Sequence, residues 1–153
     1  MAIIFVPGQV ALGDPNPGGP TATSNDKDVH IKVVKLTSAN FTTSSGTNTL
    51  VAVLPADSTI LEISAWKKTQ LSGNSISAAA LSVGTTSGGT ELVSAYDIYS
   101  VTAGNQTHLN PQTNIMQNYN VPLGADVNIY VKGVATTGNP TAGEIYLKLL
   151  YVR

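Results

Sequence analysis

Apolar and polar residues alternate with a period of two along most of the chain from residue 29 onward. The alternation is clearest in LEISAW (61–66), VNIYVK (127–132) and IYLKLLY (145–151). A period of two points one set of side chains into a core and the other set outward, so each run predicts a β-strand. Leu61, Ile63 and Ala65 are expected on the inner face of the first run.

Further runs predict strands at 30–37, 75–83, 91–99 and, most weakly, 112–119. Leu50–Leu54 is apolar on both faces, which favours a central strand. The last run reaches Arg153, so we expect the C-terminal strand to be paired in a sheet. No segment has the apolar spacing of a helix, so no helical crossovers can link parallel strands. The pattern therefore predicts an all-β fold, a jelly-roll-like antiparallel β-sandwich of about eight strands.

Residues 1–28 differ from the rest of the chain. Residues 13–28 read GDPNPGGPTATSNDKD, and the prolines and glycines disfavour both a helix and a paired strand. We interpret 1–28 as an extended N-terminal arm and 29–153 as the β-sandwich domain. The arm could span on the order of 90 Å. It begins with the apolar residues Ile3, Ile4, Phe5 and Val6, which we expect to anchor it on a partner, whereas the alternative is a disordered tail.

Composition narrows the class of protein. Charged residues make up 11% of the 153 residues, against roughly 25% in an ordinary soluble domain. The formal net charge is −1, so no basic surface predicts nucleic acid as a partner. There is no cysteine, which excludes disulfides and thiolate sites. A surface poor in charge costs little to desolvate, and it therefore suits permanent contact with other subunits.

No membrane or secretory segment is expected. Pro7 and Gly8 interrupt the apolar run Ile3–Val6, and no Lys or Arg precedes it, unlike a secretory signal. No stretch approaches 18 apolar residues. We therefore expect synthesis in the cytoplasm of the cell that makes the protein.

The segment GTTSGG (84–89) raises the question of a phosphate site. A P-loop needs GxxxxGK[ST] followed by a helix, but Thr90 and Glu91 follow Gly89, and the next segment is not helical in pattern. We interpret the segment as a turn between two strands, in which Gly88 and Gly89 supply a positive φ.

Other chemical candidates are weak. Asp26, Asp28 and His30 of DKDVH would lie on one side of an extended chain, but about 7 Å apart, which is wide for one metal ion. His108 lies in a polar stretch without a nucleophile elbow such as GxSxG. The carboxylates show no catalytic spacing. We predict no catalytic residues, no metal, no cofactor and no enzyme activity.

Longer phrases carry a family resemblance. Three segments follow one another over about residues 45–153: LVAVLPADSTILEISAWKKT, AALSVGTTSGGTELVSAYDIYSVTAG and VPLGADVNIYVKGVATTGNPTAGEIYLKLLYV. They resemble small β-rich bacteriophage virion proteins of the capsid decoration (cement) or minor structural type. The features in common are a Pro-Ala strand start, a VGT strand end with a Gly-rich turn, and a closing hairpin. The resemblance implies a structural role without catalytic residues.

We therefore expect a capsid decoration protein on the exterior of a phage head, where it stabilises the outer lattice. Its expected partners are itself, as a homotrimer, and the major capsid protein, without nucleic acid or membrane. Threefold positions of an icosahedral shell favour a trimer. The alternative is a tail or head-fibre component that binds receptor carbohydrate, with Trp66, Tyr96, Tyr99 and Tyr119 as candidate ligand-binding aromatics.

Overall fold

The computed structural model describes residues 28–43, 46–109 and 123–153. These residues form strands and one short 3-10 helix, η1 (Ser38–Asn40). The strands are β1 (Val29–Thr37), β2 (Phe41–Thr42), β3 (Thr47–Leu54), β4 (Thr59–Ser72), β5 (Ala78–Gly84), β6 (Val93–Asp97), β7 (Gln106–His108), β8 (Val127–Thr136) and β9 (Ala142–Val152).

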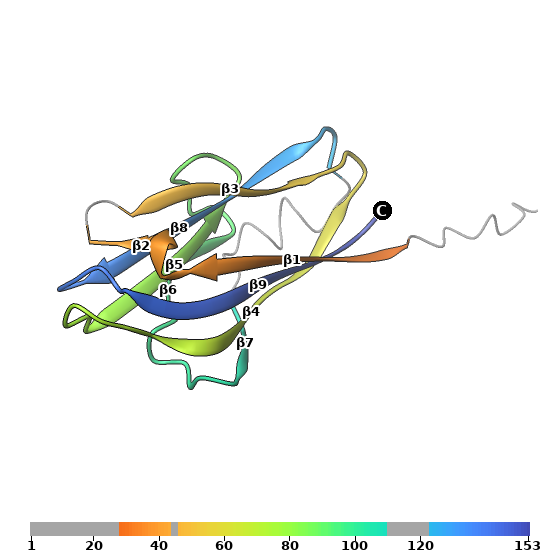
Figure 1. Ribbon diagram of the computed structural model, residues 1–153. Helices are drawn as coiled ribbons and strands as arrows, with labels where there is room; N and C mark the ends of the chain where they lie inside the picture. The colour runs from red at the N-terminus through yellow and green to blue at the C-terminus, as the bar shows by residue number, and fades with distance from the viewer. Residues whose placement is uncertain (1–27, 44–45, 110–122) are drawn as a thin grey trace, which may run out of the picture.

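The strands form two sheets that pack face to face (Figure 1). The four-stranded sheet has the order β1-β9-β4-β7. In the second sheet, with the order β2-β8-β5-β6, β3 also pairs with β8. Pairing is nested along the chain: β1 with β9, β3 with β8, β4 with β7, and β5 with β6, all antiparallel. This is the double-sheet winding of a jelly roll, and the predicted fold class is confirmed.

The core lies between the sheets and is built from the inner faces of the alternating strands. Ile145, Leu147 and Leu149 of β9 are fully buried, as are Ile129 and Val131 of β8. Strand β9 lies between β1 and β4, so the prediction that the C-terminal strand is paired is confirmed. Burying such side chains contributes about 1.5–3 kcal/mol each, which is what holds the two sheets together.

One parallel pairing departs from the antiparallel pattern. The short strand β2 runs parallel to the end of β8, with Phe41 opposite Gly133. A Cβ on Gly133 would lie 2.3 Å from the Asn40 carbonyl oxygen and 2.8 Å from the Phe41 ring. Glycine is needed here because only a residue without a side chain lets β2 approach this closely.

The prediction that Leu50–Leu54 forms a central strand is wrong. Among the described strands, β3 pairs with β8 alone, so it lies at the edge of the described sheet. Ala52 and Leu54 are buried, but Leu50 is 50% and Val53 53% exposed. A run that is apolar on both faces therefore does not require burial on both faces.

Two further differences concern β4 and its neighbour. The register of β4 on β9 shifts between Ile60 and Glu62, and this bulge leaves Leu61 52% exposed while Ile60 and Ile63 are buried. Leu61 was expected inside, but the extra residue of a bulge shifts the alternation by one position. The short strand β7 was not predicted, since QTH carries no hydrophobic pattern. The weakly predicted strand at 112–119 lies outside the described residues.

None of the helical structure in the described part of the chain is long and apolar enough to cross a membrane.

Candidate functional site

The outer face of the four-stranded sheet carries exposed apolar side chains. On β1, the alternate residues Val29, Ile31 and Val33 point away from the core and are 63%, 59% and 54% exposed. Strand β1 is the edge strand of this sheet, and Leu36, on its opposite face, is buried. Solubility does not explain three consecutive outward aliphatic residues, because a solvated sheet face normally carries polar side chains there.

The neighbouring strand extends this apolar surface. In the register of β1 on β9, Val29 lies opposite Val152 and Ile31 opposite Leu150. Directly opposite residues in an antiparallel pair point to the same face of the sheet. We call the five residues Val29, Ile31, Val33, Leu150 and Val152 the apolar stripe.

A pocket of about 250 Å³ lies at one end of the apolar stripe. The residues that line it come from all four strands of the sheet: Val33, Ser64, Trp66, Gln106, Tyr146 and Lys148. The Trp66 and Tyr146 rings stack with centroids 5.4 Å apart at 24°. The Trp66 indole N–H donates to the Gly104 carbonyl oxygen at 3.1 Å, which fixes the ring although the side chain is 41% exposed.

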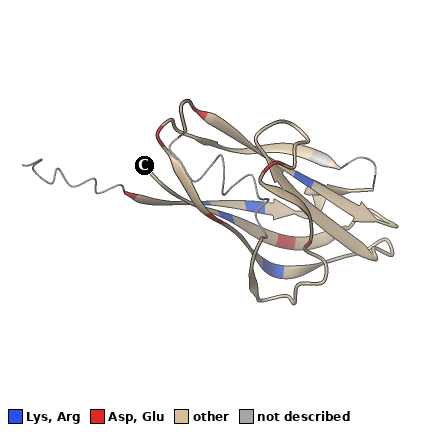
Figure 2. Cartoon of the chain, turned by 180° about the vertical axis from the view of Figure 1, so that it is seen from behind, with Lys and Arg blue, Asp and Glu red and all other residues tan. Residues whose placement is uncertain are grey.

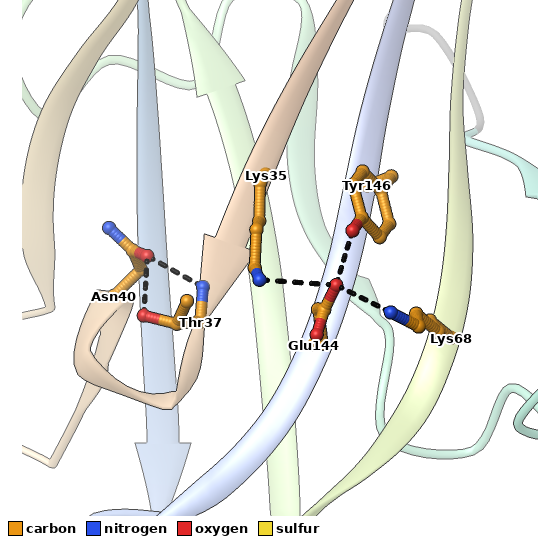
Figure 3. A network of polar contacts seen from close by, with 6 residues as sticks. All are labelled: Lys35, Thr37, Asn40, Lys68, Glu144 and Tyr146. Atoms are coloured by element: carbon orange, nitrogen blue, oxygen red, sulfur yellow. Dashed lines mark hydrogen bonds and ion pairs between the residues drawn. The ribbon is translucent and has the colours of Figure 1, made fainter.

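Beyond the pocket the same face is charged. Glu144 Oε1 lies 3.3 Å from Lys35 Nζ and 3.1 Å from Lys68 Nζ, and the Tyr146 hydroxyl donates to the same oxygen (Figure 3). The hydrogen bond from Tyr146, followed by that from Lys68, lowers the pKa of Glu144 to about 2. The carboxylate is therefore fully ionised at neutral pH, and its partners belong to the same chain.

His108 and Glu62 form a second polar contact on this face, with Nδ1 and Oε1 3.3 Å apart. This pair lies on β7 and β4, and it does not bring a third ligand or a nucleophile with it. Within residues 28–43, 46–109 and 123–153, no cluster of three or more His, Asp or Glu side chains could hold a metal ion.

The GTTSGG segment links β5 to β6. Its turn is closed by the Gly89 N–H, which donates to the Thr86 carbonyl at 2.9 Å. Gly88 has a positive φ of 79°, as predicted, but Gly89 does not. Gly89 is needed for another reason, because a Cβ there would lie 2.2 Å from the Glu91 carboxylate.

The Glu91 carboxylate lies against the GTTSGG turn and takes up two of its hydrogen-bond donors. It accepts hydrogen bonds from the Thr85 N–H at 3.1 Å and the Thr86 hydroxyl at 2.8 Å. Burial alone would raise the pKa of Glu91, but the hydrogen bonds from its own N–H, Thr86 and Thr85 lower it. An anionic side chain that takes up these donors repels a second anion, so the segment is a turn and not a phosphate site.

Lys67 is a fully buried cation that sequence reasoning did not single out. Its Nζ donates to the carbonyl oxygens of Ile98 and Tyr99, at 3.1 Å and 2.6 Å, and lies 5.6 Å from the Tyr99 ring centroid. Burial lowers the pKa of Lys67, while the charge of Asp97 opposes that shift. These contacts bind the segment after β6 to β4, and we assign Lys67 a structural role.

All of the predicted anchoring residues and one of the weak metal candidates lie in the part of the chain that the structure does not describe. Ile3, Ile4, Phe5 and Val6 lie outside the described residues, and so does Asp26 of the weak metal candidate. The His30 ring stacks on Tyr151 with centroids 5.2 Å apart.

Of the candidate sugar-binding aromatics, Tyr119 lies outside the described residues. The Tyr96 hydroxyl is 2.6 Å from the Thr107 hydroxyl, and the Tyr99 hydroxyl donates to the Ile76 carbonyl at 3.2 Å. Both tyrosines pack against the core. Of the three described residues of this set, only Trp66 lines the pocket, beside Tyr146, which the sequence analysis did not single out.

Few positions along the described strands are charged, as Figure 2 shows from the side opposite to Figure 1. The site that the geometry does support is therefore the apolar stripe together with the pocket. An apolar face of this kind is suited to protein contact or to binding a flat ligand.

No family model matches the chain, and no curated protein matches it in sequence. Its fold is similar to that of a chain in the capsid of Ralstonia phage GP4, with 17% sequence identity and a TM-score of 0.55, covering 82% of this chain and 84% of that chain. The fold is also similar to that of a chain in the capsid asymmetric unit of cyanophage Pam1, with 11% sequence identity and a TM-score of 0.55, covering 82% of this chain and 85% of that chain. The jelly roll of this protein is thus a fold that it shares with chains of two bacteriophage capsids.

Proposed function

We propose that this protein is a structural component of a bacteriophage virion, and specifically a decoration (cement) protein on the exterior of the head. The observation that carries the proposal is the jelly-roll fold, shared over 82% of the chain with chains of two phage capsids. The low charged fraction of 11% and the apolar stripe support a protein made for contact with other subunits. The function is mechanical and needs no catalytic residue.

The mechanism follows from repeated weak contacts. A rigid two-sheet body offers an apolar stripe on one face, and the residues before Asp28 offer a second apolar segment, Ile3–Val6. A copy that contacts two capsid subunits at once gains affinity through the high effective concentration of the second contact. We propose a homotrimer, since a threefold arrangement closes a ring with one repeated interface.

Light scattering after size exclusion tests the trimer. A trimer gives a mass of three times 15.8 kDa, whereas the mass of a single chain would contradict self-association in solution.

Co-sedimentation tests the capsid role. The full chain is added at increasing concentration to purified phage heads that lack it. We expect saturable binding at a fixed number of copies per head, and decorated heads that withstand higher temperature before they release DNA. Absence of binding would contradict the decoration role whatever the oligomeric state.

A carbohydrate-binding module of a tail or head fibre is the second candidate. The observation that favours it is the exposed Trp66 ring beside Tyr146 at the pocket, with Gln106 and Ser64 as hydrogen-bonding groups. A glycan array with the full chain tests this function. A glycan signal that disappears in Trp66→Ala would favour it over capsid decoration.

A further inference from the structure

We propose that the apolar segment Ile3–Val6 of one copy binds the apolar stripe and pocket of a neighbouring copy. This inference rests on the self-association proposed above and names the two surfaces that carry it. One surface belongs to the described sheet, and the other belongs to the chain that precedes Asp28.

The chemistry of the stripe selects an apolar ligand. Between Val29 and Val33, each outward position of β1 is a branched aliphatic residue that is more than half exposed. The first outward charge along β1 is Lys35, which is engaged with Glu144 at 3.3 Å. The neighbouring strand does place one cation on this face, since Lys148 lies opposite Val33 and lines the pocket. The stripe itself is aliphatic, and an aliphatic segment would remove apolar area from water on both sides.

The spacing of the segment fits the spacing of the stripe. In an extended chain, alternate side chains point to one side at intervals of about 7 Å, which is also the interval between Val29, Ile31 and Val33 along β1. Ile3 and Phe5 would therefore face the sheet together, and Pro7 ends the segment directly after Val6. If the segment binds in an extended form, its alternate apolar side chains can therefore contact those of β1 at the same interval.

The pocket suits the aromatic residue of the segment. A cavity of about 150 Å³ is large enough to hold benzene, and the pocket measures about 250 Å³. Trp66 and Tyr146 supply aromatic walls and Val33 an aliphatic one. Aromatic rings prefer such neighbours over water, so Phe5 is the residue of the segment that we assign to the pocket.

The position of Asp28 favours a neighbouring copy over the same chain. The Arg153 N–H donates to the Asp28 carbonyl at 3.2 Å, which holds Asp28 at the outer end of β1. At this end β1 extends away from the body (Figure 1), so a segment bound to the pocket of its own chain would have to reverse direction and return along β1. The residues between Val6 and Asp28 could reach roughly 75 Å, which is long enough to span to a neighbouring copy.

The edge of β1 is less suited to receive the segment than its face. Lys32 is exposed, and it lies between the outward residues Ile31 and Val33. Lysine on an edge strand disfavours the addition of another strand alongside. We therefore place the segment across the side chains of the stripe and not as a fifth strand of the sheet.

Engineered disulfides test the proposal, because the natural chain contains no cysteine. Two full-length variants, Phe5→Cys and Val33→Cys, are mixed and oxidised. A disulfide needs Cα atoms within about 7 Å, so we expect a covalent dimer that joins one copy of each variant. Val33 is exposed, so the substitution leaves the core intact, and Ile31→Cys provides a second acceptor position. The matched control mixes Phe5→Cys with Asn128→Cys, which is exposed on the opposite sheet, and should give no such product above background.

The outcomes separate this inference from the proposed function. If the mixture gives no covalent dimer at Val33 or Ile31, or gives as much at Asn128, the docking proposal is wrong. If the double variant Phe5→Cys/Val33→Cys gives only an internal disulfide, the segment binds its own chain and the proposal is overturned. Head binding of the reduced variants is measured in parallel. If it persists, the decoration role stands without this docking.

Discussion

The two ends of the outer face of the four-stranded sheet are built from the same strands but have opposite chemistry. At one end, the apolar stripe is more than half exposed along β1 and has no partner within the described residues of the chain. At the other end, Glu144 is bound by Lys35, Lys68 and Tyr146. The charged end is satisfied internally, so a partner would gain little from it. Covering the apolar end would be favourable because it removes apolar area from water, and this difference is why we propose it as the contact surface.

A charge placed in the apolar stripe should have the largest effect. We expect Ile31→Asp to weaken self-association and head binding by on the order of 100-fold, since desolvating an unpaired carboxylate costs several kcal/mol. Folding should be nearly unaffected, because Ile31 is exposed. Binding is measured by light scattering and co-sedimentation. The control is Val53→Asp, an equally apolar and 53% exposed position on the opposite sheet. Equal losses in both variants would show that the stripe has no special role.

Removal of the aromatic wall should have an intermediate effect. We expect Trp66→Ala to weaken the same binding by roughly tenfold, as buried aromatic anchors do. It should also lower the free energy of unfolding by about 1 kcal/mol through loss of the stack on Tyr146. Trp66→Phe keeps a ring and should recover most of the affinity. Binding that is unchanged in Trp66→Ala would remove the pocket from the interface.

Neutralising the charged end with Glu144→Gln should leave the affinity for phage heads within about twofold of that of the natural protein, because charges at the rim of an interface contribute little to affinity. Glu144→Gln should instead lower thermal stability in a pH-dependent way. Because the pKa of Glu144 is held at about 2, below its usual value of 4.5, its stabilising effect is fully present above about pH 4.5 and is lost as the pH falls through about 2. The difference in melting temperature between the two proteins should shrink over that range. A difference that stays constant from pH 7 to pH 2 would contradict this assignment.

Salt should have the smallest effect and should act on the two ends differently. At 1 M salt the screening length is about 3 Å, so the exposed ion pairs of Glu144 weaken. Contact through the apolar stripe should persist or strengthen, because an excluded salt such as ammonium sulfate favours apolar burial. Co-sedimentation across a salt series measures this. A steep loss of binding would assign the interface to the charged end.

Several strands were predictable because their inner and outer faces differ in the sequence itself. The alternations in β8 and β9 are local, and the structure places their inner residues in the core. The run at β3 was misjudged, since local pattern cannot distinguish an edge strand with an exposed apolar face from a central one. The bulge at Leu61 and the strand β7 escaped prediction because both depend on the pairing partner and not on the residues alone.

The candidate site was less accessible to sequence reasoning. The segment Ile3–Val6, which the sequence analysis did predict, lies outside the described residues. The apolar stripe and the pocket were not predicted. A local signal existed in VHIKV (29–33), where Val29, Ile31 and Val33 alternate with His30 and Lys32, but alternation predicts only a strand and not which of its faces stays uncovered. The pocket joins Val33, Trp66, Gln106 and Tyr146, which are far apart in the chain, and no local pattern marks them as neighbours.

The order of residues was sufficient to establish an all-β chain with a paired C-terminal strand and little charge. These properties follow from alternation and composition, which act over a few residues at a time. Folding was needed to settle which faces remain uncovered. Strand order places β1 and β3 at sheet edges, and register sets Val29 beside Val152 and Trp66 beside Tyr146. The physical reason is that burial is a property of neighbours brought together by long-range pairing, so an exposed apolar face is visible only once every strand has its partner.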